Sequence, residues 1–144
     1  MTSLPDRRRF LRIAAAGCGL ASCGALAACA GVPVLRAGVD GGRVRLRRAD
    51  VDDAFGDGDA ILVQAEALPE SIYLVRAEGG GFRAVGATCT HLGCQVRPAR
   101  AFFRCPCHGS TFRADGEVVR GPATRPLARY ALRVDGAFLL IEVP

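Results

Sequence analysis

Two short segments rich in cysteine and histidine constrain the fold of this chain more than any other part of its sequence. The first reads Cys-Thr-His-Leu-Gly-Cys over 89–94, and the second reads Cys-Pro-Cys-His-Gly-Ser over 105–110. Ten residues separate these two boxes, which together hold both histidines of the chain and four of its seven cysteines. Such a concentration indicates metal ligation, so the fold has to hold two loops around one centre.

The spacing within the boxes favours one kind of metal chemistry. Cys89 and Cys105 offer two thiolates, and His91 and His108 offer two imidazoles. Two irons bridged by two sulfides need four protein ligands, and in one arrangement the cysteines bind one iron while the histidines bind the other. The remaining cysteines of the boxes are then in excess, and they could tie the two loops together as a disulfide.

The boxes are similar to the two cluster-binding boxes of the Rieske [2Fe–2S] iron–sulfur proteins. Dioxygenase-type Rieske ferredoxins lack the second cysteine of each box, so Cys94 and Cys107 favour the branch found in quinol–cytochrome c reductases. That branch implies a Cys94–Cys107 disulfide. Gly121-Pro122-Ala123 also matches the loop, called the Pro loop, that covers the cluster in the family. The resemblance spans about residues 60–144 and implies one [2Fe–2S] cluster.

Two other interpretations use some of the same residues. A zinc ion could be held by the two thiolates and two imidazoles, but zinc alone leaves Cys94 and Cys107 unexplained. A pair of structural disulfides is possible in an exported domain, but it leaves both histidines unexplained.

The resemblance also implies a role for each histidine. His91 and His108 would ligate the outer iron and keep their other ring nitrogens near the surface. Neutral imidazoles in place of thiolates raise the reduction potential, and they couple electron uptake to proton uptake. In quinol-oxidising members the histidine of the second box meets the quinol, which makes His108 the candidate contact.

Four neighbours of the ligands match family positions that tune or cover the cluster. The resemblance implies that Leu92 shields the cluster from water, that the Ser110 hydroxyl bonds a bridging sulfide, and that Pro122 stiffens the covering loop. Phe112 stands where high-potential members have a tyrosine that bonds a ligand sulfur. Without that hydroxyl we expect a lower potential, and a lower-potential quinone becomes an alternative to ubiquinol.

Residues 1–30 are predicted to be a targeting segment rather than part of the fold. Arg7-Arg8-Arg9-Phe10-Leu11 fits the twin-arginine export pattern, and an uncharged apolar run follows. Leu26-Ala27-Ala28-Cys29 resembles a lipobox, so Cys29 is the candidate for lipidation. Cys23 is a second match, and an uncleaved membrane anchor or a free periplasmic protein are the alternatives. We expect the mature protein in the periplasm or on the outer face of the cytoplasmic membrane.

The rest of the chain predicts a flexible tether over 31–42 and an all-β domain over 43–144. The domain should be a small antiparallel β-sandwich with the boxes in a loop subdomain between about 86 and 121. Glycines at 79–81 and Asp135-Gly136 are expected to form hairpin turns. Residues 51–59 are expected to be a loop, and no amphipathic helix is expected after residue 35. The predicted strands are 43–47, 60–65, 71–77, 82–87, 127–134 and 137–143.

Charge and motif content exclude several function classes. From residue 30 onward the chain carries 15 arginines against 13 acidic residues. This near balance of charge does not predict the strongly basic surface of a nucleic-acid-binding protein. No catalytic nucleophile, phosphate loop or carboxylate pair is apparent, so we expect an electron carrier that acts within a complex.

Three kinds of partner remain open for such a carrier. The first is a cytochrome b-type quinol-oxidising complex with a c-type cytochrome as acceptor. The second is the large subunit of a periplasmic molybdenum oxidase such as arsenite oxidase, and the third is an unknown partner of a stand-alone lipid-anchored carrier. The short segment between the boxes moderately favours the last two.

Overall fold

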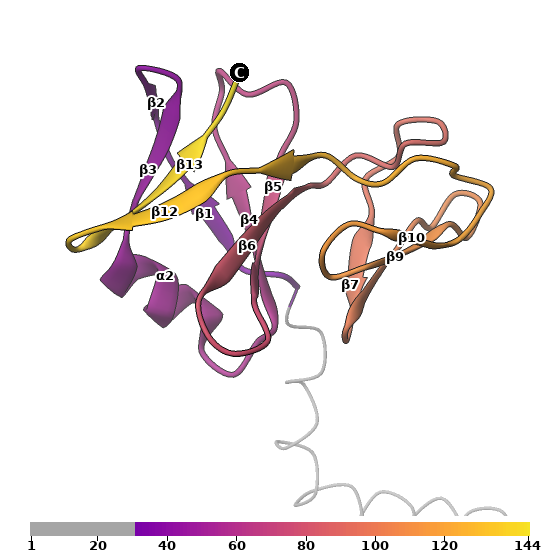
Figure 1. Cartoon of the computed structure of the whole chain (residues 1–144), viewed down its shortest axis with the longest axis horizontal. Coiled ribbons are helices and arrows are strands. Elements are labelled where there is room, and N and C mark those ends of the chain that lie inside the picture. Colours follow the sequence, from indigo (N-terminus) through magenta and orange to yellow (C-terminus); the bar gives the residue numbers. More distant parts are fainter. Residues whose placement is uncertain (1–30) are drawn as a thin grey trace, which may run out of the picture. The chain divides into compact units, whose positions relative to one another are not determined.

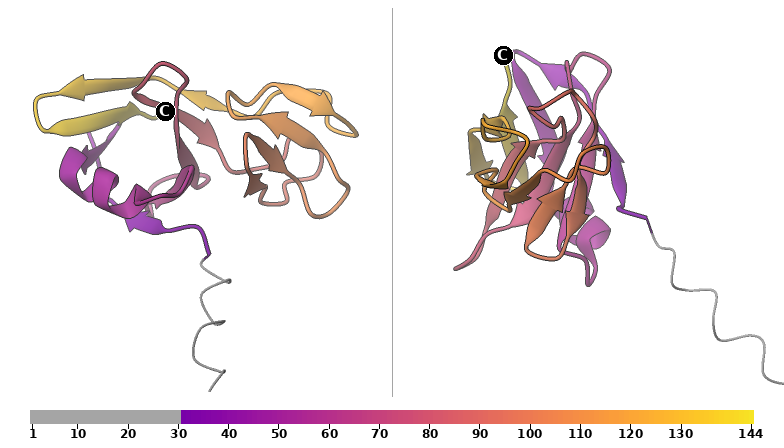
Figure 2. Two further views of the ribbon diagram at one scale, coloured as in Figure 1. Left: turned by 90° about the horizontal axis from the view of Figure 1, so that it is seen from below. Right: turned by 90° about the vertical axis from the view of Figure 1, so that its right-hand side faces the viewer.

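A computed structural model describes residues 31–144, which are mostly β-strand arranged in three sheets (Figure 1). Two sheets form a base, and the third belongs to a small lobe that we define as residues 87–128. In the left view of Figure 2 the strands of the small lobe lie beside those of the base as a separate group. The all-β class predicted from the sequence is confirmed.

The first sheet of the base has β5 at its centre and is antiparallel except at one edge. Residues of β4 pair with β5, those of β5 pair with β6, and β1 adds to β4 in parallel. In sheet order the strands are β1 (Val34–Arg36), β4 (Ala60–Gln64), β5 (Ile72–Arg76), β6 (Phe82–Gly86) and β11 (Arg129–Tyr130).

The second sheet packs on one face of the first. Val44 and Leu46 alternate with exposed arginines along β3, and the buried Leu139 and Ile141 alternate with half-buried residues along β13. These four side chains share one buried core with Ile61, Val63, Ile72 and Leu74 of the first sheet. The strands in sheet order are β12 (Leu132–Asp135), β13 (Phe138–Glu142), β3 (Arg43–Arg47) and β2 (Val39–Asp40).

The opposite face of the first sheet is also buried, and the small lobe covers it. Leu62, Tyr73 and Val85 share a second core with Phe103 and Phe112 of the lobe. Strands β4 and β5 are therefore buried on both sides, which explains why they read as continuous apolar runs. The strands of the lobe in sheet order are β10 (Val118–Arg120), β9 (Thr111–Arg113), β8 (Phe102–Arg104) and β7 (Arg97–Ala99).

The two hairpins predicted from turn residues are present. Arg76 pairs with Phe82 across the 79–81 glycines, and Asp135 pairs with Phe138 across Gly136. The strand boundaries at 43–47 match β3.

The expected loop over 51–59 is wrong in its first half, because helix α2 (Arg48–Phe55) occupies it. Val51 and Phe55 lie four residues apart on one face of the helix and are both buried. Gly56 then ends the helix with a positive φ of 45°. An eight-residue helix with only two inward-facing side chains leaves no periodic pattern that a sequence can reveal.

The flexible tether expected over 31–42 is also corrected, because most of that segment belongs to the base. The Leu62 N–H donates to the Pro33 carbonyl at 2.8 Å, and the Ala37 N–H donates to the Gln64 carbonyl at 2.9 Å. Gly41 and Gly42 form the turn between β2 and β3 and are not part of a free linker.

The predictions for the twin-arginine motif, for Cys29 and for most of the alternative membrane anchor lie outside the described residues. Within 31–144, no helix has the length and apolar character needed to cross a membrane.

Candidate metal centre

The first box folds into a tight loop closed by its own backbone. The Cys89 N–H donates to the Cys94 carbonyl at 2.8 Å, and the Gly93 N–H donates to the Cys89 carbonyl at 2.9 Å. Gly93 has φ of +79°, a conformation that side chains disfavour, so the loop requires glycine there.

The second box repeats the same design. The Cys105 N–H donates to the Ser110 carbonyl at 2.8 Å, and the Gly109 N–H donates to the Cys105 carbonyl at 3.0 Å. Gly109 has φ of +77° and stands four residues after its cysteine, as Gly93 does in the first box. The two loops are thus local copies of each other, and each presents one cysteine at its start.

The structure brings the four predicted ligands together as two pairs. Cys89 and Cys105 are buried in the core shared with the base, and their thiols are close enough to hydrogen-bond. The rings of His91 and His108 meet edge to face, with centroids 4.9 Å apart. His108 is exposed and His91 is half-buried, so the thiol pair forms the inner end of the site and the imidazole pair the outer end.

One buried atom tests whether these residues fit a metal cluster. Nδ1 of His91 is buried, and no hydrogen-bond partner for it lies within the described part of the chain. Buried polar atoms nearly always have a partner, and an imidazole nitrogen without one is a ready metal ligand. With two thiols and a second imidazole at hand, the donor set fits the mixed cysteine and histidine ligation of a Rieske cluster.

The backbone around the two thiols stabilises their charged forms unequally. Burial raises the pKa of the Cys89 thiol, and the neighbouring Cys105 adds to this, against hydrogen bonds from the His91 N–H and the Ser110 hydroxyl. Burial also acts on Cys105, but hydrogen bonds from the Cys107 and His108 backbones and from the Cys89 side chain outweigh it and lower the pKa. Thiolate is the form that binds iron, so these N–H groups suit ligation.

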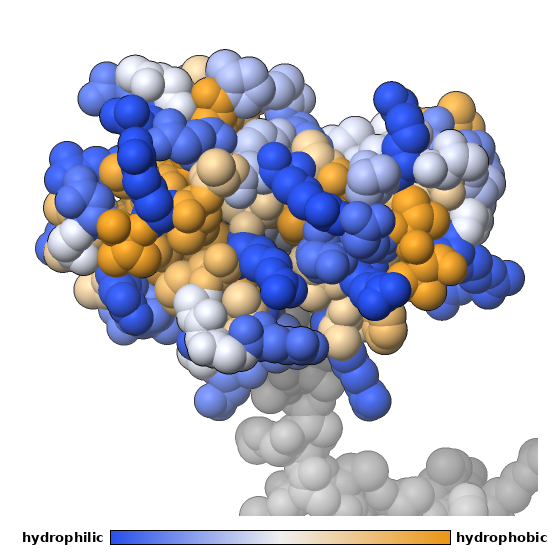
Figure 3. Space-filling view, viewed as in Figure 1, coloured by the Kyte–Doolittle hydropathy of each residue, from blue (hydrophilic) through white to orange (hydrophobic). Residues whose placement is uncertain are grey.

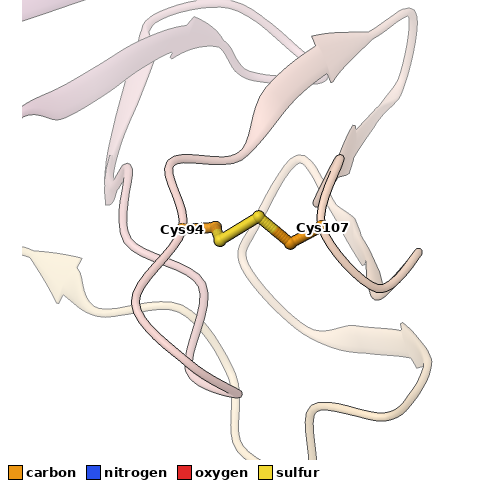
Figure 4. The surroundings of a disulfide bond; sticks show 2 residues. All are labelled: Cys94 and Cys107. Atoms are coloured by element: carbon orange, nitrogen blue, oxygen red, sulfur yellow. A yellow bond between two sulfur atoms is a disulfide. The ribbon is translucent and has the colours of Figure 1, made fainter.

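The predicted disulfide is confirmed. Cys94 and Cys107 are bonded, with an S–S distance of 2.05 Å, and the bridge joins the first box to the second (Figure 4). The sulfurs of Cys94, Cys105 and Cys107 lie within 4.8 Å of one another. Because two of them are bonded to each other, this group is not a metal site in itself, but it places the bridge directly beside the Cys105 thiol.

Ser110 connects the second box to the Pro loop. It is 0% exposed, and its Oγ accepts a hydrogen bond from the Ala123 N–H at 3.0 Å. That bond uses Oγ as an acceptor, so the hydroxyl hydrogen can point toward the Cys89 sulfur. The predicted bond from Ser110 to a bridging sulfide, and the covering role of the exposed Pro122, stay predictions.

The two apolar neighbours occupy opposite environments. Leu92 is 68% exposed, beside His91 on the outer end of the site. Phe112 is 0% exposed and packs in the core between the small lobe and the base. Its ring offers no hydroxyl to a ligand sulfur, as the sequence predicts.

Two polar residues that the sequence did not single out support the first box. Glu70 accepts hydrogen bonds from the Thr88 N–H and the Tyr130 hydroxyl, each at 2.9 Å. Thr90 donates from its hydroxyl to the Arg125 carbonyl at 2.6 Å. A glutamate in a turn and a threonine within a loop carry no sequence signal of such roles, because their partners are far away in the chain.

Known proteins are similar to this chain in sequence and in fold. The family model for the Rieske [2Fe–2S] domain matches residues 48–131, more than half of the chain. The cytochrome b6-f complex iron–sulfur subunit of Chlorobaculum thiosulfatiphilum is 40% identical over 75 residues, which cover 51% of this chain and 41% of that subunit. The chain thus spans about two fifths of the length of that curated relative.

Solved structures of Rieske proteins are also similar to this chain. The cyanobacterial plasma membrane Rieske protein PetC3 from Synechocystis PCC 6803 is 35% identical, with a TM-score of 0.55 over 67% of this chain and 95% of that one. A chain in the complex of reduced oxygenase and oxidised ferredoxin in carbazole 1,9a-dioxygenase has a TM-score of 0.52 at 22% identity, covers 68% of this chain and 92% of that one, and shares the fold alone. This chain belongs to the Rieske [2Fe–2S] family and is an electron-transfer protein with one cluster.

Proposed function

We propose that the protein accepts one electron from a quinol and passes it to a c-type cytochrome, as the iron–sulfur subunit of a cytochrome b-type complex. The observation that carries the proposal is the arrangement of the site from inside to outside: its thiols are buried, and His108 is exposed beside His91. The name of the Chlorobaculum relative, a cytochrome b6-f complex subunit, supports it.

A quinol has to lose a proton together with each electron, and the residues of this chain suit that demand. When bound, the cluster supplies a one-electron acceptor whose redox state changes the basicity of its histidine ligands. Cys89, Cys105, His91 and His108 would hold it. The exposed ring of His108 can meet a quinol hydroxyl and take its proton, while the exposed Leu92 offers an apolar contact to the quinol ring.

A redox titration of the full-chain protein across pH tests the proposal, with the visible and EPR spectra as the signals. We expect a positive midpoint potential that falls as pH rises, because oxidation then releases a proton from an imidazole. A low midpoint that is independent of pH near neutrality would refute quinol oxidation and favour a relay subunit, as in a molybdenum oxidase. A colourless protein without iron would point to zinc.

We also infer that the protein is exported folded by the twin-arginine route and lipid-anchored at Cys29. The motif over 7–11 and the lipobox-like 26–29 support this inference, as does a disulfide, which persists in an oxidising compartment. Replacing Arg7 and Arg8, the twin arginines of the pattern, by Lys should leave the protein in the cytoplasm. Mass spectrometry of the exported form should find an acylated Cys29 as its first residue, and an intact N-terminus would contradict lipidation.

A further inference from the structure

Arginines stand in a row across the sheet of the small lobe. Strand register pairs Arg97 with Arg104, Arg104 with Thr111, and Thr111 with Arg120. A register shift in β10 between Val118 and Arg120 brings Arg120 opposite Thr111, so these four residues lie side by side, one from each of β7, β8, β9 and β10. All three arginines are exposed. Arg113 and Phe102, themselves paired, follow on the same face.

The other face of this sheet is the one that packs on the base. Its row consists of Pro98, Phe103, Phe112 and Val118, all of them buried or half-buried. The arginine row consequently points away from the base toward solvent. On the side of the molecule seen in Figure 3, blue hydrophilic side chains alternate with orange apolar ones over the small lobe.

None of the arginines in this row forms an ion pair within residues 31–144. The ion pairs of residues 31–144 use Arg43, Arg48, Arg129 and Arg133, and all four lie in the base. The small lobe holds six arginines and two acidic residues, and one of these acids, Glu117, pairs with Arg129 of the base.

Such an arrangement opposes folding rather than assisting it. Like charges directly opposite each other on neighbouring strands are destabilising, and Arg97 and Arg104 are such a pair. A surface that keeps an unfavourable local arrangement is a candidate for function.

We propose that this arginine face is the docking surface for a redox partner whose own surface is acidic. The inference rests on the proposed electron-transfer function and names the charge of the partner. Arg104 directly precedes the ligand Cys105, and Thr111 directly follows Ser110, so a protein bound to this row lies against the second box. Guanidinium groups bind carboxylates in a two-pronged geometry, and the 43% exposed Phe102 adds an apolar anchor to the face.

A binding experiment tests the docking surface. It uses the full-chain, cluster-loaded protein and two immobilised c-type cytochromes, one acidic and one basic, as probes. The test variant is Arg97→Gln/Arg120→Gln, which leaves the neighbours of the ligands intact. The matched control is Arg36→Gln/Arg47→Gln, which removes two exposed, unpaired arginines from the base. Visible spectra verify the cluster in each variant, and vesicles of phosphatidylcholine with phosphatidylserine provide a second anionic probe.

We expect binding to the acidic cytochrome alone, weakening steeply with salt, and at least about fivefold weaker in the test variant than in the control. Equal loss in both variants, or equal binding to both cytochromes, would overturn the proposal. Binding to the vesicles but not to the acidic cytochrome would overturn it in favour of a membrane surface. Docking that is intact while the cluster gives a low, pH-independent midpoint would instead refute the proposed quinol oxidation.

Discussion

Phe112 packs in the core at a position that the family resemblance links to redox tuning. Its ring lies 0% exposed between the small lobe and the base, two residues beyond the second box, which ends at Ser110. A phenylalanine fills this space as well as a tyrosine would, but it leaves the nearby sulfurs without one hydrogen bond. Because hydrogen bonds to the ligand sulfurs stabilise the more negative, reduced cluster, we expect this position to affect the reduction potential.

Phe112→Tyr is expected to raise the midpoint potential. A hydrogen bond to a charged group contributes about 1.5–3 kcal/mol, which for a one-electron couple corresponds to about 60–130 mV at most. Protein-film voltammetry measures the shift. Phe103→Tyr adds the same hydroxyl to the facing strand and serves as the control, with little change in potential. An unchanged potential in Phe112→Tyr would mean that the hydroxyl does not reach a sulfur.

Among the elements, Glu70 joins three that are far apart in sequence. It precedes β5, accepts from the Thr88 N–H at the start of the first box, and accepts from Tyr130 of β11. Gly86 leaves room for this carboxylate, because a Cβ at that position would collide with it. Through Glu70, the start of the small lobe at Thr88 is thus linked to two strands of the base, β5 and β11.

The hydrogen bond from the Tyr130 hydroxyl to Glu70 makes the free energy of unfolding depend on pH in the alkaline range. Burial first, and then the Glu70 carboxylate, raises the pKa of Tyr130 to about 12. The native state therefore holds the phenolic proton more tightly than the unfolded state does. The stabilisation that this proton gives to the native state is complete below pH ~10, and it is lost as the pH rises from ~10 to ~12. We expect Tyr130→Phe to flatten this part of a denaturant-derived stability profile. Some pH dependence should remain in the variant, because burial also raises the pKa of Tyr73.

The Cys94–Cys107 bridge acts on the two box loops as a pair. It closes a loop of 13 residues, for which chain entropy predicts about 3 kcal/mol of stabilisation. Cys94→Ala/Cys107→Ala keeps all four predicted ligands and should lower cluster occupancy and thermal stability, measured by iron content and calorimetry. Full occupancy together with an unchanged potential would show that the bridge does not hold the site.

At the scale of the whole domain, the five-stranded sheet of the base serves two cores. One core joins it to the second sheet, and the other joins it to the small lobe and contains Cys89 and Cys105. The thiols of these two predicted ligands are therefore part of the packing of the domain. Binding of a cluster to the folded state should stabilise the small lobe by mass action.

Removal of the cluster should consequently loosen the small lobe more than the base. Hydrogen exchange followed by mass spectrometry compares the loaded and cluster-free proteins. We expect faster exchange over 87–128 after removal, while β4 and β5 keep their protection because they pair with each other inside the base. Equal acceleration over both regions would show that the two cores unfold as one unit.

The sequence by itself determined the features that depend on local chemistry. The spacing of the boxes and their surplus cysteines predicted the paired loops and the disulfide, and turn residues predicted two hairpins. Alternation of arginine and apolar residues along 43–47 predicted β3, and the apolar run after Asp135-Gly136 predicted β13. Each of these follows from residues that are close in the chain, or from covalent chemistry that only a few residue types can perform.

Only the tertiary structure decided the features that depend on distant partners. Helix α2 is stabilised by burial of two side chains against strands of the base, and β1 becomes a strand because β4 lies beside it. The hydrogen bond from Tyr130 to Glu70 joins residues 60 positions apart, and the arginine row arises from the register of four strands. Such contacts are set by how sheets pair and pack, which no short stretch of sequence specifies.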